Sequence, residues 1–208
     1  MRTFALAIVV AVAALWGCGG ESAPKTAIVT GRITDVDGLP VRGARVSASG
    51  GETVSSTNGD YVLEGVAARD VMVFAELSAN GTTYRGQNLA RAFDAEHTNS
   101  VNIVVAPSSQ LASIRGRVED REGFALRGAS VFALGDGSLS SARAVTDNDG
   151  NFRIEGLIAG VPYTLNAGGG GYSSDSDGVV LEAREERFIR FVLGNPGFPS
   201  LPQPEDLT

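Results

Sequence analysis

The chain of 208 residues is poor in the side chains on which most active sites depend. It contains one cysteine, one histidine and one tryptophan, and Lys25 is its single lysine. A zinc peptidase needs three protein ligands, commonly two histidines and a glutamate. A Ser-His-Asp or Cys-His arrangement could be built only on His97. We interpret His97 as a solvated loop residue and predict no catalytic residue, no metal and no cofactor.

Positive charge is also scarce. The sequence has 17 lysines and arginines against 24 aspartates and glutamates, which gives a formal net charge of -7. Nucleic acids and anionic lipid surfaces are bound through clustered cations that release counterions. The arginines of this chain are scattered, so we exclude nucleic acid as a partner.

The longest apolar run lies at the N-terminus, from Phe4 to Trp16. About 13 residues suffice for the apolar region of a signal peptide and fall short of the roughly 20 that a membrane-spanning helix needs. The segment from Leu15 to Cys18 resembles the bacterial lipoprotein box, with an aliphatic residue three positions before the cysteine and a small residue directly before it. This resemblance implies that residues 1–17 are removed and that Cys18 carries the lipid.

A lipid on Cys18 would tether the chain to a membrane, because one acyl chain holds a protein marginally and two or more hold it firmly. Since Cys18 is the single cysteine, no intramolecular disulfide can form. Loss of residues 1–17 removes Arg2 and moves the formal charge from -7 to -8. Gly19 and Gly20 lack an acidic inner-membrane retention signal. We therefore predict an exported, membrane-anchored bacterial protein and prefer the outer membrane, with the periplasmic or surface face left open.

The rest of the chain contains one segment twice. Residues 30–46 return as residues 115–131, with the glycines and in-phase apolar residues kept and the polar residues changed. Because the apolar frame is kept, what repeats is a fold and not a set of catalytic residues. The offset between copies later grows by six residues, which places an insertion between Val131 and Thr146 at a hairpin tip.

Short runs of Val, Ile, Thr and aromatic residues with period-two alternation indicate β-strands, and pairs such as Asn58-Gly59 indicate hairpins. We predict strands at 27–34, 44–48, 52–56, 61–64, 71–78, 82–88 and 100–105 in the first copy. In the second copy we predict them at 114–118, 129–134, 142–146, around Phe152 and Ile154, at 163–167 and at 187–193, with a loop over 168–171.

The spacing of glycines, Gly-Ala-x-Val, Thr-Asp-x-x-Gly-x-Phe and a final Gly-Tyr resembles the carboxypeptidase regulatory-like domain. The second copy matches it through Gly116, Val118, Asp120, Gly123, Leu126, Gly128, Ala129, Val131, Thr146, Asp147, Gly150, Phe152, Gly156, Gly171 and Tyr172. In the first copy, Ser55 and Ser56 stand where Thr-Asp is expected. The resemblance implies an all-β protein of two tandem seven-stranded, transthyretin-like Greek-key β-sandwiches. We predict that the chain consists of a signal peptide (1–17), a spacer (18–26), domain 1 (27–106), a linker (107–110), domain 2 (111–194) and a Pro-rich disordered tail (195–208).

Such a domain specifies a fold and little about function. We predict a non-catalytic, lipid-anchored cell-envelope protein that acts as a binding, adhesion or structural module, with an envelope protein as its partner. The alternative is a carbohydrate-binding protein of the envelope, because sugar rings stack on exposed aromatic rings. Tyr84 and Tyr172, which we expect near loop tips, are the candidate contacts with a ligand. An accessory subunit of a separate envelope enzyme is a third alternative.

Two short acidic segments, 35–38 and 147–151, superficially resemble calcium loops. An EF-hand needs twelve residues with a terminal bidentate glutamate and flanking helices. Asp and Gly in such a short segment are typical of a turn, in which the carboxylate bonds its own backbone. We predict hairpin turns at both places, with weak calcium binding as the alternative.

Overall fold

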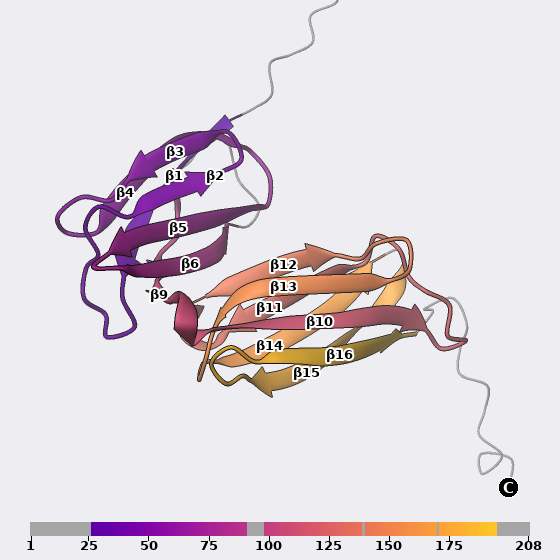
Figure 1. Ribbon diagram of the computed structural model, residues 1–208. Coiled ribbons are helices and arrows are strands. Elements are labelled where there is room, and N and C mark those ends of the chain that lie inside the picture. The colour runs from indigo at the N-terminus through magenta and orange to yellow at the C-terminus, as the bar shows by residue number, and fades with distance from the viewer. Residues whose placement is uncertain (1–25, 91–97, 139, 170, 195–208) are drawn as a thin grey trace, which may run out of the picture.

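The protein is an all-β structure, which confirms the predicted class. A computed structural model describes residues 26–90, 98–138, 140–169 and 171–194 (Figure 1). Within these ranges the elements are strands and two short 3-10 turns, with no α-helix. No helix in the described part of the chain is long and apolar enough to cross a bilayer.

The described strands form two groups that do not share a sheet (Figure 1). We call the first group the N-terminal unit. Its strands are β1 (Thr26–Thr34), β2 (Arg45–Ala48), β3 (Gly51–Val54), β4 (Asp60–Ala67), β5 (Val71–Ala79), β6 (Thr82–Ala90), β7 (Thr98–Ser100), β8 (Ile103–Val104) and β9 (Ala106–Pro107). One sheet has the order β4-β1-β7, with β8 also paired to β1, and the other has the order β3-β2-β5-β6-β9.

The C-terminal unit follows a 3-10 turn, η1 (Ser108–Gln110). Its strands are β10 (Leu111–Asp120), β11 (Ser130–Gly135), β12 (Ser141–Val145), β13 (Asn151–Ile158), β14 (Pro162–Gly169), β15 (Tyr172–Val180) and β16 (Glu186–Leu193), with a second turn, η2 (Asp136–Ser138), between β11 and β12. They form sheets in the orders β13-β10-β16 and β12-β11-β14-β15. The turn η2 confirms the predicted insertion at a hairpin tip.

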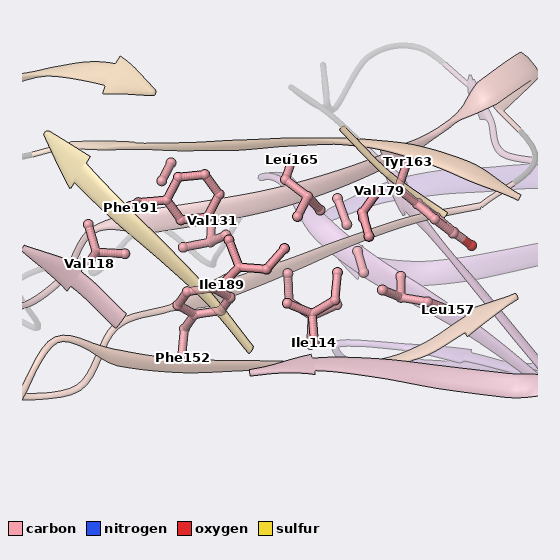
Figure 2. Close-up of a cluster of buried hydrophobic side chains, with 14 of the residues drawn as sticks. Ile114, Val118, Val131, Phe152, Leu157, Tyr163, Leu165, Val179, Ile189 and Phe191 are labelled. Atoms are coloured by element: carbon pink, nitrogen blue, oxygen red, sulfur yellow. The ribbon is translucent and has the colours of Figure 1, made fainter. Parts of the chain in front are cut away.

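Each unit has its own hydrophobic core between its two sheets. Alternate residues of the strands point inward, as in β13, where Phe152 and Ile154 are buried and their neighbours are exposed. Figure 2 shows this packing in the C-terminal unit, where Ile114 lies among side chains from both sheets. Stacking two sheets in this way buries the apolar half of every strand.

Turns form at both predicted acidic segments, and the turn at Asp35 closes an antiparallel bridge between Thr34 and Pro40. The predictions of hairpins at Asp147 and at Asn58-Gly59 were wrong, because the strands that these turns join, β12 to β13 and β3 to β4, belong to different sheets. The Asp35 Oδ1 atom accepts hydrogen bonds from the backbone N–H groups of Asp37 at 3.0 Å and Leu39 at 2.9 Å. The Asp147 Oδ1 atom likewise accepts from Asp149 at 2.9 Å and Asn151 at 2.8 Å. Both carboxylates therefore hold the backbone of their own turns.

Ser55 replaces the expected threonine without loss of its hydrogen bonds. In the C-terminal unit, Thr146 Oγ1 accepts from the Ala129 N–H at 2.9 Å and donates to the Leu126 carbonyl at 2.5 Å. In the N-terminal unit, Ser55 Oγ accepts from the Ala44 N–H at 2.9 Å and donates to the Val41 carbonyl at 2.7 Å. The first copy thus departs from the pattern in residue type and keeps the same contacts.

The sequence pattern missed two strands, the two-residue β9 and the longer β15, and the strand predicted over 100–105 is divided between β7 and β8. The strand β15 follows the predicted loop at 168–171 and pairs antiparallel with β14 from Pro162↔Val180 to Gly169↔Tyr172. Its segment is rich in serine and aspartate and has no apolar alternation over its first half. Backbone pairing along an edge strand does not need apolar side chains, so composition alone hides such a strand.

The central strand of each unit contains one glycine at a position where no side chain could fit. β1 pairs antiparallel with β4 and parallel with β7 and β8, while β10 pairs antiparallel with β13 and parallel with β16. A Cβ atom on Gly31 would lie 1.9 Å from the Val101 carbonyl oxygen, and one on Gly116 would lie 1.9 Å from that of Ile189. No other residue fits at such a distance, because the obstacle is backbone and cannot move aside.

An aromatic ring covers each of these glycines. Tyr61 in β4 stands opposite Gly31, and Phe152 in β13 stands opposite Gly116. The Tyr61 hydroxyl donates a 2.6 Å hydrogen bond to the Val101 carbonyl, and burial raises the pKa of Tyr61 well above its ordinary value. The ring fills the space that a side chain on the glycine would otherwise occupy.

We predict that Gly31→Ala lowers the free energy of unfolding by about 3 kcal/mol or more, because the strands must separate to admit the methyl group. Gly178→Ala is the matched control, since its Cβ would meet no atom within 4 Å and its backbone does not require a positive φ. Its effect should stay within about 1 kcal/mol. Urea denaturation of both variants measures the difference, and equal stabilities would contradict the close approach.

Tyr61 also predicts a loss of stability in alkali. Because its pKa is raised in the folded state, its contribution is complete below about pH 10 and is lost as the pH rises further. Tyr61→Phe should lose about 1 kcal/mol at pH 8 through the missing hydrogen bond. It should then lose less stability than the parent protein between pH 9 and 11, in urea titrations at each pH. Parallel losses in the two proteins would contradict this assignment.

Candidate functional site

The most distinctive feature of the surface is the seam where the two units meet. The outer edge of β6 is paired with β9 only at Tyr84 and Arg85. Beyond them, β6 is faced by β12, the strand that follows the inserted turn η2 (Figure 1). The insertion that distinguishes the second copy from the first therefore leads directly into the joint between the units.

Hydrogen bonds cross the seam through buried side chains. The Leu89 N–H donates to Ser141 Oγ at 2.8 Å, and the Ser141 hydroxyl donates to Asn88 Oδ1. The Asn88 amide in turn donates to the Asn102 carbonyl at 2.8 Å, which ties this network back to the N-terminal unit. Asn88, Leu89 and Ser141 are all at most 9% exposed. Buried polar groups satisfied in this way fix one relative placement.

Ser140 makes a second link across the seam and connects it to the C-terminal core. Its side chain is fully buried, and its hydroxyl lies 3.4 Å from the Gln87 carbonyl oxygen across the seam. Ser140 also hydrogen bonds to Tyr163, whose hydroxyl accepts a 2.8 Å bond from the Ile158 N–H. Burial is the main cause that raises the pKa of Tyr163. Met72 of the N-terminal unit packs against the same core.

Clefts flank the seam. A cleft of about 680 Å³ on one side is lined by Arg32, Asn88, Asn102, Leu134 and Ser141, among others. Two clefts, of about 340 and 330 Å³, share Phe74, Gln87 and Glu155 in their linings. Phe74 is 47% exposed although it is a large apolar residue. Small-molecule sites are commonly concave and formed where two units meet.

The residues singled out from the sequence do not gather at these clefts. Tyr84 lies in β6, partly buried against the N-terminal core and not at a loop tip. Tyr172 begins β15, and its side chain is outside what the structure describes. Cys18 and His97 also lie outside the described residues.

Within the described part of the chain, no three His, Cys, Asp or Glu side chains are close enough to hold a metal. The charged groups near the clefts form ion pairs instead. Hydrogen bonds to Glu155 and Glu186 raise the pKa of Arg153. The site therefore consists of clefts, one exposed aromatic ring and charged side chains that are already paired.

Comparison with known proteins supports part of the predicted resemblance. Residues 113–194 match the sequence profile of the carboxypeptidase regulatory-like domain. The chain is 29% identical over 176 residues to the inverse autotransporter adhesin YeeJ of Escherichia coli (strain K12), and the alignment covers 72% of this chain and 8% of that protein. The chain thus spans less than a tenth of the length of this relative.

Solved structures give looser likenesses. The TIE protein of Bacillus anthracis has a TM-score of 0.37 at 14% identity, over 82% of this chain and 34% of that one. The minor pilin of Streptococcus agalactiae has a TM-score of 0.36 at 14% identity, over 85% of this chain and 99% of that one. Scores this low carry no argument about function.

We predict that Ser141→Ala loosens the seam. Removal of the hydroxyl leaves the buried Leu89 N–H with a poorer partner and should lower stability by about 1–3 kcal/mol. Ser108→Ala is the control, because the exposed Ser108 hydroxyl makes a 2.9 Å bond to the Thr83 carbonyl near the joint. It should change stability by at most about 0.5 kcal/mol. Calorimetry measures the stability of both variants. Small-angle scattering should show a broader distribution of interatomic distances for Ser141→Ala alone, because its two units move relative to each other. An unchanged profile and melting curve would contradict the role of Ser141.

Proposed function

We propose that the chain is a non-catalytic, lipid-anchored protein of the cell envelope that serves as a binding, adhesion or structural module. The observation that carries this proposal is the alignment with an adhesin over most of the chain. The lipoprotein-like segment from Leu15 to Cys18 supports the anchor, and Gly19 and Gly20, which provide no acidic retention signal, support the preferred outer-membrane address. Among the described residues, Asp35 and Asp147 use their carboxylates to hold backbone turns, which is a structural role.

The two units are proposed to be two copies of one transthyretin-like, seven-stranded sandwich, with β7 and β8 in the place of β16. Two equivalences support this. Gly31 and Gly116 are overlain by Tyr61 and Phe152 at the same position of the sheet, as described above. The shared hydroxyl contacts of Ser55 and Thr146 supply the second equivalence.

Carbohydrate binding is the second candidate function. It is favoured by one observation, the exposed Phe74 ring where two clefts meet. The tyrosines proposed from the sequence support it less. Tyr84 is partly buried against its own core, and the orientation of the Tyr172 side chain is not described.

The anchor predicts the behaviour of Cys18→Ser. Without a thiol to carry the thioether-linked lipid, the variant should leave the membrane fraction while keeping the parent protein's β-type circular dichroism spectrum. Palmitate labelling of parent and variant cells followed by membrane fractionation measures this. Membrane recovery and labelling equal to those of the parent would contradict lipid anchoring.

Two further measurements separate the candidate functions. Crosslinking in intact envelopes should recover the same envelope protein reproducibly with the parent chain if the chain is an adhesion or structural module. Glycan binding that is lost in Tyr172→Ala would favour carbohydrate recognition through the tyrosine proposed from the sequence. Turnover of a substrate by the purified chain would contradict the non-catalytic proposal.

A further inference from the structure

The outer face of the sheet formed by β2, β5 and β6 presents an ordered set of side chains at the seam. Directly opposed residues of antiparallel strands share a face. Phe74 in β5 stands between Ser47 in β2 and Gln87 in β6. In the next row on the same face, Glu76 stands between Arg45 and Arg85. These six residues form a floor with one aromatic ring and five polar groups.

The C-terminal unit supplies the opposing wall. The Gln87 side-chain amide donates a 2.5 Å hydrogen bond to the Glu155 carbonyl. The following residue, Gly156, has a φ of +73°, and a Cβ there would lie 3.3 Å from Gln87 Nε2. A glycine thus permits both the turn and the close approach of the wall to the floor. Leu111 completes the lining of the cleft on this side.

The half-exposed Phe74 ring has no stacking partner, in contrast to Phe188 and Phe132. Arg115 lies over the ring of the exposed Phe188 at 5.6 Å, and Arg143 lies over that of Phe132 at 5.5 Å. Among the described residues, no guanidinium or aromatic group stacks on Phe74. Arg45 and Arg85, the two arginines of the floor, form ion pairs with carboxylates instead. An open ring face in a concave place is the surface on which another flat apolar face can pack.

The charges around the ring cancel. Arg85 Nε lies 2.8 Å from Glu76 Oε2, and Arg45 Nη1 lies 3.6 Å from Glu52 Oε2. Each guanidinium in this floor is therefore already matched by a carboxylate. An anionic ligand would have to displace these carboxylates, whereas hydroxyl groups can donate to a carboxylate and accept from a guanidinium without breaking the pair.

We propose that this floor and wall bind a neutral oligosaccharide, with one sugar ring stacked on Phe74 and its hydroxyls on Arg85, Glu76 and Gln87. This inference rests on carbohydrate binding as the second candidate function. It places the sugar site at the seam, and not at Tyr84 or Tyr172. The two clefts meet at Phe74, so a linear chain can run past the ring. A peptide strand gains its backbone hydrogen bonds at a sheet edge, and this floor is the face of a sheet.

The test is isothermal titration of the purified full-length chain with cellohexaose, maltohexaose and chitohexaose, and with hexagalacturonate as the anionic comparator. At least one neutral probe should bind, and the anionic comparator should bind more weakly than that probe. Phe74→Ala should weaken the neutral binding about tenfold or more, because the buried ring surface is lost. Phe74→Trp should keep or strengthen it.

The matched control is Phe188→Ala, which removes an exposed phenylalanine that lines neither of the two clefts and should leave binding unchanged. Thermal melts of each variant verify that it is folded. Neutral binding that survives Phe74→Ala would overturn this site and leave the carbohydrate candidate standing. Binding of none of the neutral probes, or of hexagalacturonate alone, would overturn both. Either result leaves the lipid anchor, which is tested by Cys18→Ser, untouched.

Discussion

The fold depends on one constraint, the approach of backbone to backbone at a bare glycine in the central strand of each unit. At Gly31 and Gly116, a neighbouring carbonyl occupies the position of a Cβ atom. The space on the core side is closed by a ring from the antiparallel neighbour. Strand pairing on both edges and packing between the sheets thus meet at the same residue, so none of the three can shift without the others.

This frame leaves the outer surfaces and the connections free to differ between the units. The longer hairpin of the C-terminal unit uses that freedom, since Ser140 and Ser141 follow its turn and bond to β6. The seam in turn brings Glu155 and Gly156 over the outer face of β5 and β6. The residues that follow this loop thus take part in a joint, and the joint carries a concave surface that is lined by both units.

Much of the fold could be predicted because apolar alternation and turn residues act locally. The turns at Asp35 and Asp147 and the insertion before Thr146 were all visible in the sequence. β15 was not, because its pairing is carried by backbone and its segment is polar. The exposed Phe74 left a faint signal, since Val73 and Ala75 point inward and an apolar residue between them must point outward. Its importance depends on the neighbouring Gln87, which bonds to Glu155 at a separation of 68 residues that no local pattern contains.

The account rests most directly on the two units being held as one body through the Asn88–Leu89–Ser141 network. Amide hydrogen exchange followed by NMR measures this at a single group, the Leu89 N–H, which bonds to a side chain of the other unit. The account predicts protection of Leu89 comparable to that of core amides such as Ile33 and Val118. Exchange of the Leu89 amide as fast as that of exposed turn residues would contradict it.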